Sequence, residues 1–107
     1  SLGRIQLDQK QPEAALVLFR EEIKIREEAT RLRPDDAEAK VALAEAYGHA
    51  ARSLDLTNTT SRSLAAFYLE QAVALVEKLP TDLQTRSDIS VKTADFKSSL
   101  ATILGME

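Results

Sequence analysis

The sequence predicts an all-α domain of about five helices. Only three glycines and three prolines occur in 107 residues, too few for the many tight turns of a β-sandwich or barrel. Between the prolines, apolar residues recur at spacings of three and four, as they do along one face of a helix. No segment alternates apolar and polar residues over the length of a strand, so no strand is predicted. A chain of this length supports one domain with a modest core.

The first complete helix is expected to begin at Gln11-Pro12-Glu13 and to run to Arg33. Proline is favoured in a first helical turn, and an acidic residue there lies near the positive end of the helix dipole. The apolar residues of this helix form two adjacent rows, which are Ala15, Leu18, Ile25, Ala29 and Leu32, and Leu16, Phe19 and Ile23. So wide an apolar face predicts neighbouring helices on more than one side.

Two polar turns divide the rest of the chain. Pro34-Asp35-Asp36 ends the first helix and caps an alanine-rich second one. Residues 54–63 predict a loop, in which Asn58-Thr59-Thr60 matches a glycosylation acceptor but is better interpreted as a cap for the next helix. That third helix is expected over Leu64–Leu79. A final helix is expected to start near Pro80-Thr81-Asp82 and to continue to Leu104, with a stop at Gly105.

The charge pattern disfavours nucleic acid and membrane as partners. Fourteen basic and seventeen acidic residues give a net charge of -3, and the basic residues alternate with acids instead of forming a basic patch. The longest apolar run, Ala14 to Phe19, is far too short to span a bilayer.

The chain lacks cysteine, which fits a reducing compartment, so we expect a cytoplasmic protein. No signal peptide is visible. Since the chain starts at Ser1 and not at a methionine, we expect a piece of a larger protein.

No arrangement of residues predicts catalysis, a metal or a cofactor. Glu45 and His49 lie four residues apart on one helix face, but the single histidine has no further clustered ligand. The adjacent carboxylates, such as Glu21 and Glu22, point about 100° apart on a charged helical face. No serine lies in a nucleophile motif, and the three glycines are scattered. We therefore expect a protein that is not an enzyme and holds neither metal nor cofactor.

A repeat runs through the first three helices. Leu2-Gly3 recurs 41 residues later as Leu43-Ala44. The first pair is followed by Ala15, Phe19, Ala29 and Pro34, and the second by Tyr47, Ala65, Leu69, Ala72 and Pro80. This pattern resembles the tetratricopeptide repeat (TPR), with a lengthened repeat similar to the kinesin-light-chain type. Gln6 and Lys40 depart from it, since they stand where the family has Tyr and Trp.

The resemblance implies a superhelical solenoid of antiparallel helical hairpins. Residues 1–34 would form a partial first repeat, 35–80 a second repeat, and 81–105 a capping or third-repeat helix. In this family the first helices of successive repeats line a concave groove for a peptide or a partner helix. The groove residues implied here are Arg4, Leu7, Asp8, Glu38, Val41, Glu45, Gly48 and His49. Five of them, Glu38, Val41, Glu45, Gly48 and His49, form one stripe along the second helix. The alternative is that this stripe packs against the last helix, Asp82 to Leu104.

The resemblance therefore implies a non-catalytic protein–protein interaction module, part of a signalling or regulatory protein. Val41 and Glu45 fall where chaperone-tail clamps of the family carry Lys and Asn, so an uncharged or basic ligand fits better than a C-terminal carboxylate. A second hypothesis is a structural helical element that self-associates through its long helices as a homo-oligomer.

Overall fold

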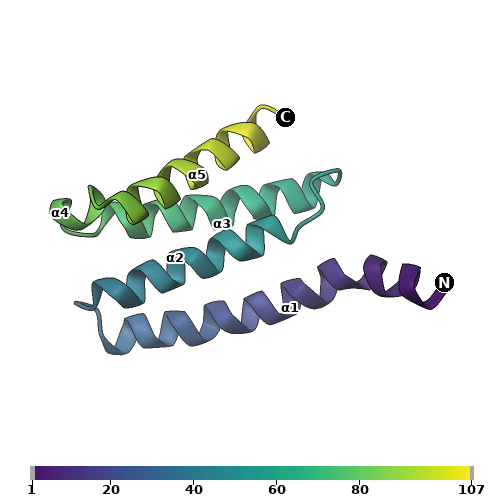
Figure 1. Ribbon diagram of the computed structural model, residues 1–107, viewed down its shortest axis with the longest axis horizontal. Coiled ribbons are helices and arrows are strands. Elements are labelled where there is room, and N and C mark those ends of the chain that lie inside the picture. The colour runs from purple at the N-terminus through teal and green to yellow at the C-terminus, as the bar shows by residue number, and fades with distance from the viewer. Residues whose placement is uncertain (1, 107) are drawn as a thin grey trace.

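The computed structural model describes the backbone of residues 2–106 and the side chains of residues 14–106, and within these bounds the chain is helical without strands (Figure 1). Five helices are present: α1 (Leu2–Leu32), α2 (Ala37–Arg52), α3 (Thr59–Glu77), α4 (Thr81–Gln84) and α5 (Ser87–Leu104). The prediction of an all-α domain with about five helices is confirmed. Within residues 2–106, no helix combines the length and hydropathy needed to cross a membrane.

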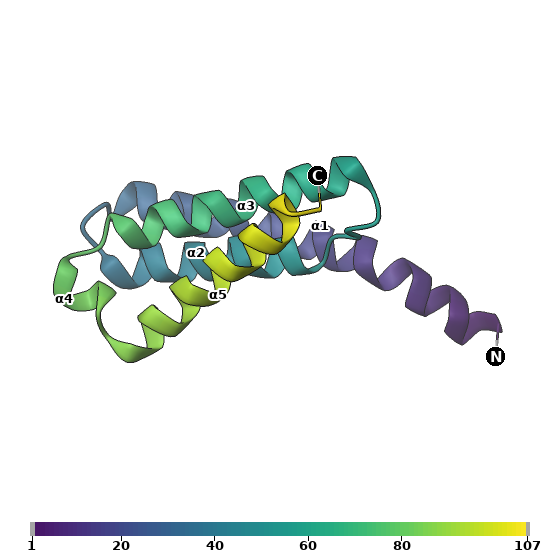
Figure 2. The same cartoon turned by 90° about the horizontal axis from the view of Figure 1, so that it is seen from above.

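The helices follow one another as antiparallel neighbours. α2 packs between α1 and α3, and α5 packs mainly on α3. Figure 2 shows that α5 runs obliquely across the α2–α3 pair and that the N-terminal part of α1 extends beyond the ends of the other helices. The short α4 turns the chain between α3 and α5, at the same end of the molecule as the α1–α2 connection.

The core lies mainly between α2 and α3 and consists largely of alanine. Its buried alanines are Ala44, Ala46, Ala50, Ala51, Ala65, Ala66 and Ala72. Small side chains at a helix crossing let the two helices approach closely. Larger residues such as Leu43, Leu69 and Val76 complete the layer, and α5 adds Ile89, Phe96 and Ile103. α1 and α5 pack on this α2–α3 hairpin.

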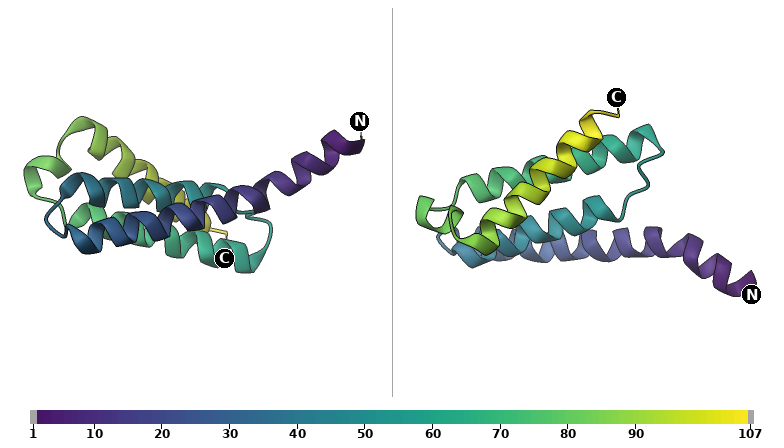
Figure 3. Two further views of the ribbon diagram at one scale, coloured as in Figure 1. Left: turned by 90° about the horizontal axis from the view of Figure 1, so that it is seen from below. Right: turned by 45° about the horizontal axis from the view of Figure 1, so that its top comes forward.

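The expected helix start at Gln11-Pro12-Glu13 is wrong, because α1 is one continuous helix from Leu2. An interior proline lacks one backbone hydrogen bond and crowds the carbonyl four residues earlier, which commonly bends a helix without ending it. Figure 3 shows the N-terminal part of α1 turned away from the line of the rest. Residues 2–32 therefore form one helix where the resemblance implies parts of two. Gly3, the glycine of the first Leu-Gly pair, lies before residue 14, so its packing falls outside the described side chains.

The caps predicted for α2 and α3 are confirmed. The Asp36 side chain accepts hydrogen bonds from the amides of Glu38 and Ala39, at 3.0 and 3.2 Å. The Asn58 side chain accepts from the amides of Thr60 and Ser61, at 2.8 and 3.3 Å. Since Asn58 is the cap, α3 begins at Thr59, five residues before the predicted start, and the connecting loop is correspondingly shorter.

The single final helix predicted from Pro80 to Leu104 is wrong, because the chain breaks between α4 and α5 at Thr85 and Arg86. The Gln84 side chain donates to the carbonyls of Glu77 and Leu79, at 3.1 and 2.7 Å, and so holds α4 against the end of α3. The predicted stop is confirmed, since α5 ends with Gly105 as its C-cap.

Candidate binding cleft between α2 and α5

A cleft of about 440 Å³ separates the first half of α2 from α4 and the first half of α5. We call it the α2–α5 cleft. Its lining comprises Ala37, Glu38, Val41, Ala42, Glu45, Leu83, Arg86, Asp88, Ile89 and Lys92. Val41, Leu83 and Ile89 give it an apolar floor, because all three belong to the core cluster or pack against it. The structure thus brings three of the predicted groove residues, Glu38, Val41 and Glu45, to one cleft.

A smaller hollow of about 180 Å³ continues along the same side of α2. It is lined by Glu45, Gly48, His49, Arg52, Lys92, Asp95 and Phe96. Glu45 and Lys92 belong to both hollows and so form the divide between them. Gly48 is buried directly beneath Phe96, whose Cε1 atom lies 2.6 Å from where a glycine Cβ would stand. For Gly48 the alternative therefore holds: it packs against the last helix.

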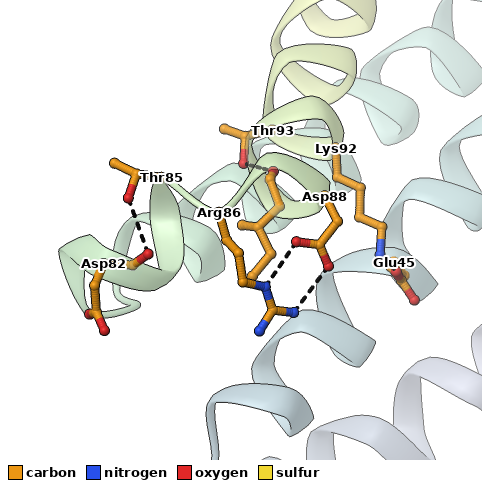
Figure 4. A network of polar contacts seen from close by, with 8 residues as sticks. Glu45, Asp82, Thr85, Arg86, Asp88, Lys92 and Thr93 are labelled. Atoms are coloured by element: carbon orange, nitrogen blue, oxygen red, sulfur yellow. Dashed lines mark hydrogen bonds and ion pairs between the residues drawn. The ribbon is translucent and has the colours of Figure 1, made fainter.

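Two ion pairs form the charged rim of the cleft (Figure 4). The Arg86 guanidinium donates to both carboxylate oxygens of Asp88, with N–O distances of 2.9 and 3.0 Å. This bidentate contact lowers the pKa of Asp88 to about 2, because hydrogen bonding and positive charge stabilise the carboxylate. The second pair joins Lys92 on α5 to Glu45 on α2, and it is the polar link across the cleft.

The remaining charge on the rim belongs to Glu38. Its side chain is exposed, and its negative charge adds to the larger effect of Asp88 in raising the pKa of Arg86. The lining therefore carries three carboxylates and two cations, of which Asp88 and Glu45 are already paired. The cleft is mildly acidic, with its excess negative charge at the α2 edge.

His49 lies at the far end of the α2 stripe and also faces α1. Its ring centroid is 5.6 Å from that of Phe19, with the rings tilted by 41°. Among the described residues, no group of three or more His, Cys, Asp or Glu side chains gathers at a geometry suited to a metal. The other predicted groove residues, Arg4, Leu7 and Asp8, lie in α1, and their side chains fall outside the described residues.

The sequence analysis did not identify the cleft residues that come from α4, α5 and the turn between them. Leu83, Arg86, Asp88 and Lys92 supply one wall of the cleft, yet none belongs to a recognisable motif. The usable signal was the apolar spacing of Ile89 and Phe96, which predicted a buried face on the final helix without saying which helix it meets. The alternative that the α2 stripe faces residues 82–104 pointed to this wall.

No family model, no curated protein and no solved structure matches the chain.

Proposed function

We propose that this domain is a non-catalytic interaction module that holds a peptide or a partner helix in the α2–α5 cleft, in the manner of a TPR domain. The observation that carries the proposal is the cleft: an apolar floor between two packed helices, bordered by ion pairs. A concave site of this kind accepts an apolar anchor residue and orients it through a few polar groups. The cytoplasmic location expected from the sequence stays a prediction.

The repeat interpretation is supported by the central hairpin. α2 and α3 lie within residues 35–80, the range of the second repeat. Ala44, Ala65 and Ala72, which occupy small-residue positions of the repeat pattern, are fully buried between helices. α5 packs on this hairpin as a third-repeat or capping helix would. In this interpretation α2 and α5 are successive groove helices, and the cleft between them is the groove.

The charges favour an uncharged or basic segment as the ligand. A partner that covers Asp88 or Glu45 meets carboxylates that already have cationic partners, so no lone charge is buried on binding. Glu38 is the exposed carboxylate, and it favours a lysine or arginine next to the apolar anchor. Because both walls are helices, binding does not have to order the receptor, and less free energy is lost on association.

Selection from a phage-displayed library of random dodecapeptides tests the proposal. We expect the recovered peptides to carry an apolar anchor with a basic neighbour, and we expect fluorescence anisotropy to show weaker binding to Val41→Gln and to Glu38→Arg. The matched control is Val91→Gln, because Val91 is an exposed valine of α5 that does not line the cleft. Peptides that bind Val41→Gln and Glu38→Arg as tightly as the unaltered chain would show that the cleft is not the binding site.

A further inference from the structure

The outer side of α1 carries a row of exposed aliphatic residues. Leu18, Ile25 and Leu32 are 69%, 66% and 66% exposed, and we call these three residues the heptad stripe. The other apolar row of α1, with Phe19 and Ile23, is the one that packs on the core. α1 lies at the edge of the molecule with α2 on one side only (Figure 1). The second neighbour that the wide apolar face predicts is therefore missing from the described part of the chain.

The spacing of the stripe is that of a coiled coil. Its residues are seven apart, so they form one line about 21 Å long on the helix surface. Ala15 and Ala29 lie three residues before Leu18 and Leu32, at the complementary core positions, and their small side chains leave room for a second helix. Glu22 occupies the middle complementary position, where it limits the affinity of any close pairing.

The charges on either side of the heptad stripe favour a second copy of α1 as the binding partner, and they favour a parallel orientation. Glu21 and Glu28 lie on one flank, and Arg26 and Arg33 lie on the other. When two copies of α1 run parallel, the glutamate flank of each copy faces the arginine flank of the other. The paired residues then differ by five in residue number. Glu21 then meets Arg26 of the second copy, and Glu28 meets its Arg33. An antiparallel pair would instead place Glu against Glu and Arg against Arg.

The groups needed for these pairs are accessible. Glu21 lies 3.8 Å from Lys24 and Glu28 pairs with Arg31, but both contacts are on the exposed surface, where such pairs contribute little and exchange readily. Among the side chains of residues 14–106, neither Arg26 nor Arg33 takes part in an ion pair. Arg33 directly follows α1, and its amide still donates to the Ala29 carbonyl at 3.0 Å, which continues the helical turn.

We propose that this chain forms a parallel homodimer through the heptad stripe of α1. This inference is independent of peptide binding in the cleft, which lies on the α5 side of α2. Three layers of the heptad stripe, two alanine layers and one opposing Glu22 layer place the interface at the small end of specific interfaces, so the dimer is weak and concentration-dependent.

Sedimentation velocity of the whole chain, from micromolar to millimolar concentration, tests dimerisation. We expect Ile25→Asp to weaken the dimer by at least about tenfold, and Val91→Asp to leave it unchanged because Val91 is similarly exposed on α5. Val41→Gln in the cleft should also leave it unchanged, which separates failure of this proposal from failure of the proposed function. A monomer at every concentration, or a dimer indifferent to Ile25→Asp, would overturn it and leave the stripe to another occupant.

Orientation is tested by single cysteines, since the chain has none of its own. In a parallel dimer Leu18→Cys forms a disulfide with its own copy under mild oxidation. In an antiparallel coiled coil each residue of the heptad stripe faces a complementary core position, so Leu18 faces Ala29 of the second copy. A cross-link then appears only when Leu18→Cys is mixed with Ala29→Cys. That second result would refute the parallel arrangement. The charge pairing predicts that Glu21→Arg and Arg26→Glu each weaken dimerisation and that a mixture of the two variants restores it.

Discussion

At Gly48, α5 approaches α2 closely because no side chain is present. It lies inside the helix, where glycine costs roughly 0.5–1 kcal/mol relative to alanine. The position nevertheless favours glycine, because Phe96 covers it from α5 and is itself only 6% exposed. Gly48 therefore contributes close packing of α5 on α2, and through it the position of the cleft wall.

We expect Gly48→Ala to lower the free energy of unfolding by about 1 kcal/mol. Overpacking against a buried ring costs about 1–3 kcal/mol, and the better helix propensity of alanine recovers part of this. Urea denaturation measures the change. In a Phe96→Leu background the same substitution should be neutral or stabilising, because the ring edge is gone. If Gly48→Ala stabilises the unaltered chain, Phe96 does not lie over this residue.

Single residues were predictable from the sequence where their partners are local. Asp36 and Asn58 cap helices through amides two and three residues away, so their roles follow from their position before a helix. Glu45 and Lys92 are 47 residues apart, and their pairing depends on how α5 crosses α2. No local pattern carries that information.

At the scale of elements, the α2–α3 contact depends on small side chains. Ala72 is fully buried in α3, whereas Ala74, two positions further along the same helix, is exposed. We expect Ala72→Leu to destabilise the protein by about 1–3 kcal/mol, because a larger side chain forces the two helices apart. Ala74→Leu is the matched control and should change stability by less than about 0.5 kcal/mol. Thermal denaturation of both variants measures the difference, and equal melting temperatures would contradict the alanine packing.

The helix ends that were predicted wrongly share a physical cause. Pro12 was expected to start a helix, but a proline flanked by helical segments can remain inside one at the cost of a bend. Thr85 and Arg86 were expected to be helical, but Gln84 is held by carbonyls at the end of α3, and the chain turns there. In both cases the position of the helix end depends on contacts with other parts of the chain, which local helix propensity does not describe.

For the whole molecule, the sequence left open whether the α2 stripe faces an open groove or the last helix. Because α5 crosses α2 obliquely, both arrangements occur along the stripe. Gly48 is covered by Phe96 of the last helix, whereas Glu38 and Val41 line the open cleft. Helix periodicity defines which face of a helix is apolar, but the crossing angle between two helices depends on side chains from both. The sequence therefore pointed to the last helix as a neighbour of α2, but it did not predict which of its residues form the second wall of the cleft.

The distribution of the core predicts how stability varies over the molecule. Eleven of the sixteen buried apolar residues found among residues 14–106 belong to α2 and α3, each of which packs on two other helices. Three belong to α5. We expect native-state hydrogen exchange to show the slowest amides in α2 and α3, opening only with global unfolding, and faster exchange in α5 through partial opening.

Two core truncations sharpen this expectation. Leu69→Ala removes a buried side chain from the α2–α3 layer, so it should speed exchange throughout the molecule, because it lowers the free energy of global unfolding. Ile103→Ala removes a buried side chain from the end of α5, and it should mainly speed exchange within α5. Equal effects of the two variants on α2, α3 and α5 would mean that the domain opens only as one unit. The α2–α3 hairpin would then not remain folded when α5, which forms one wall of the cleft, opens.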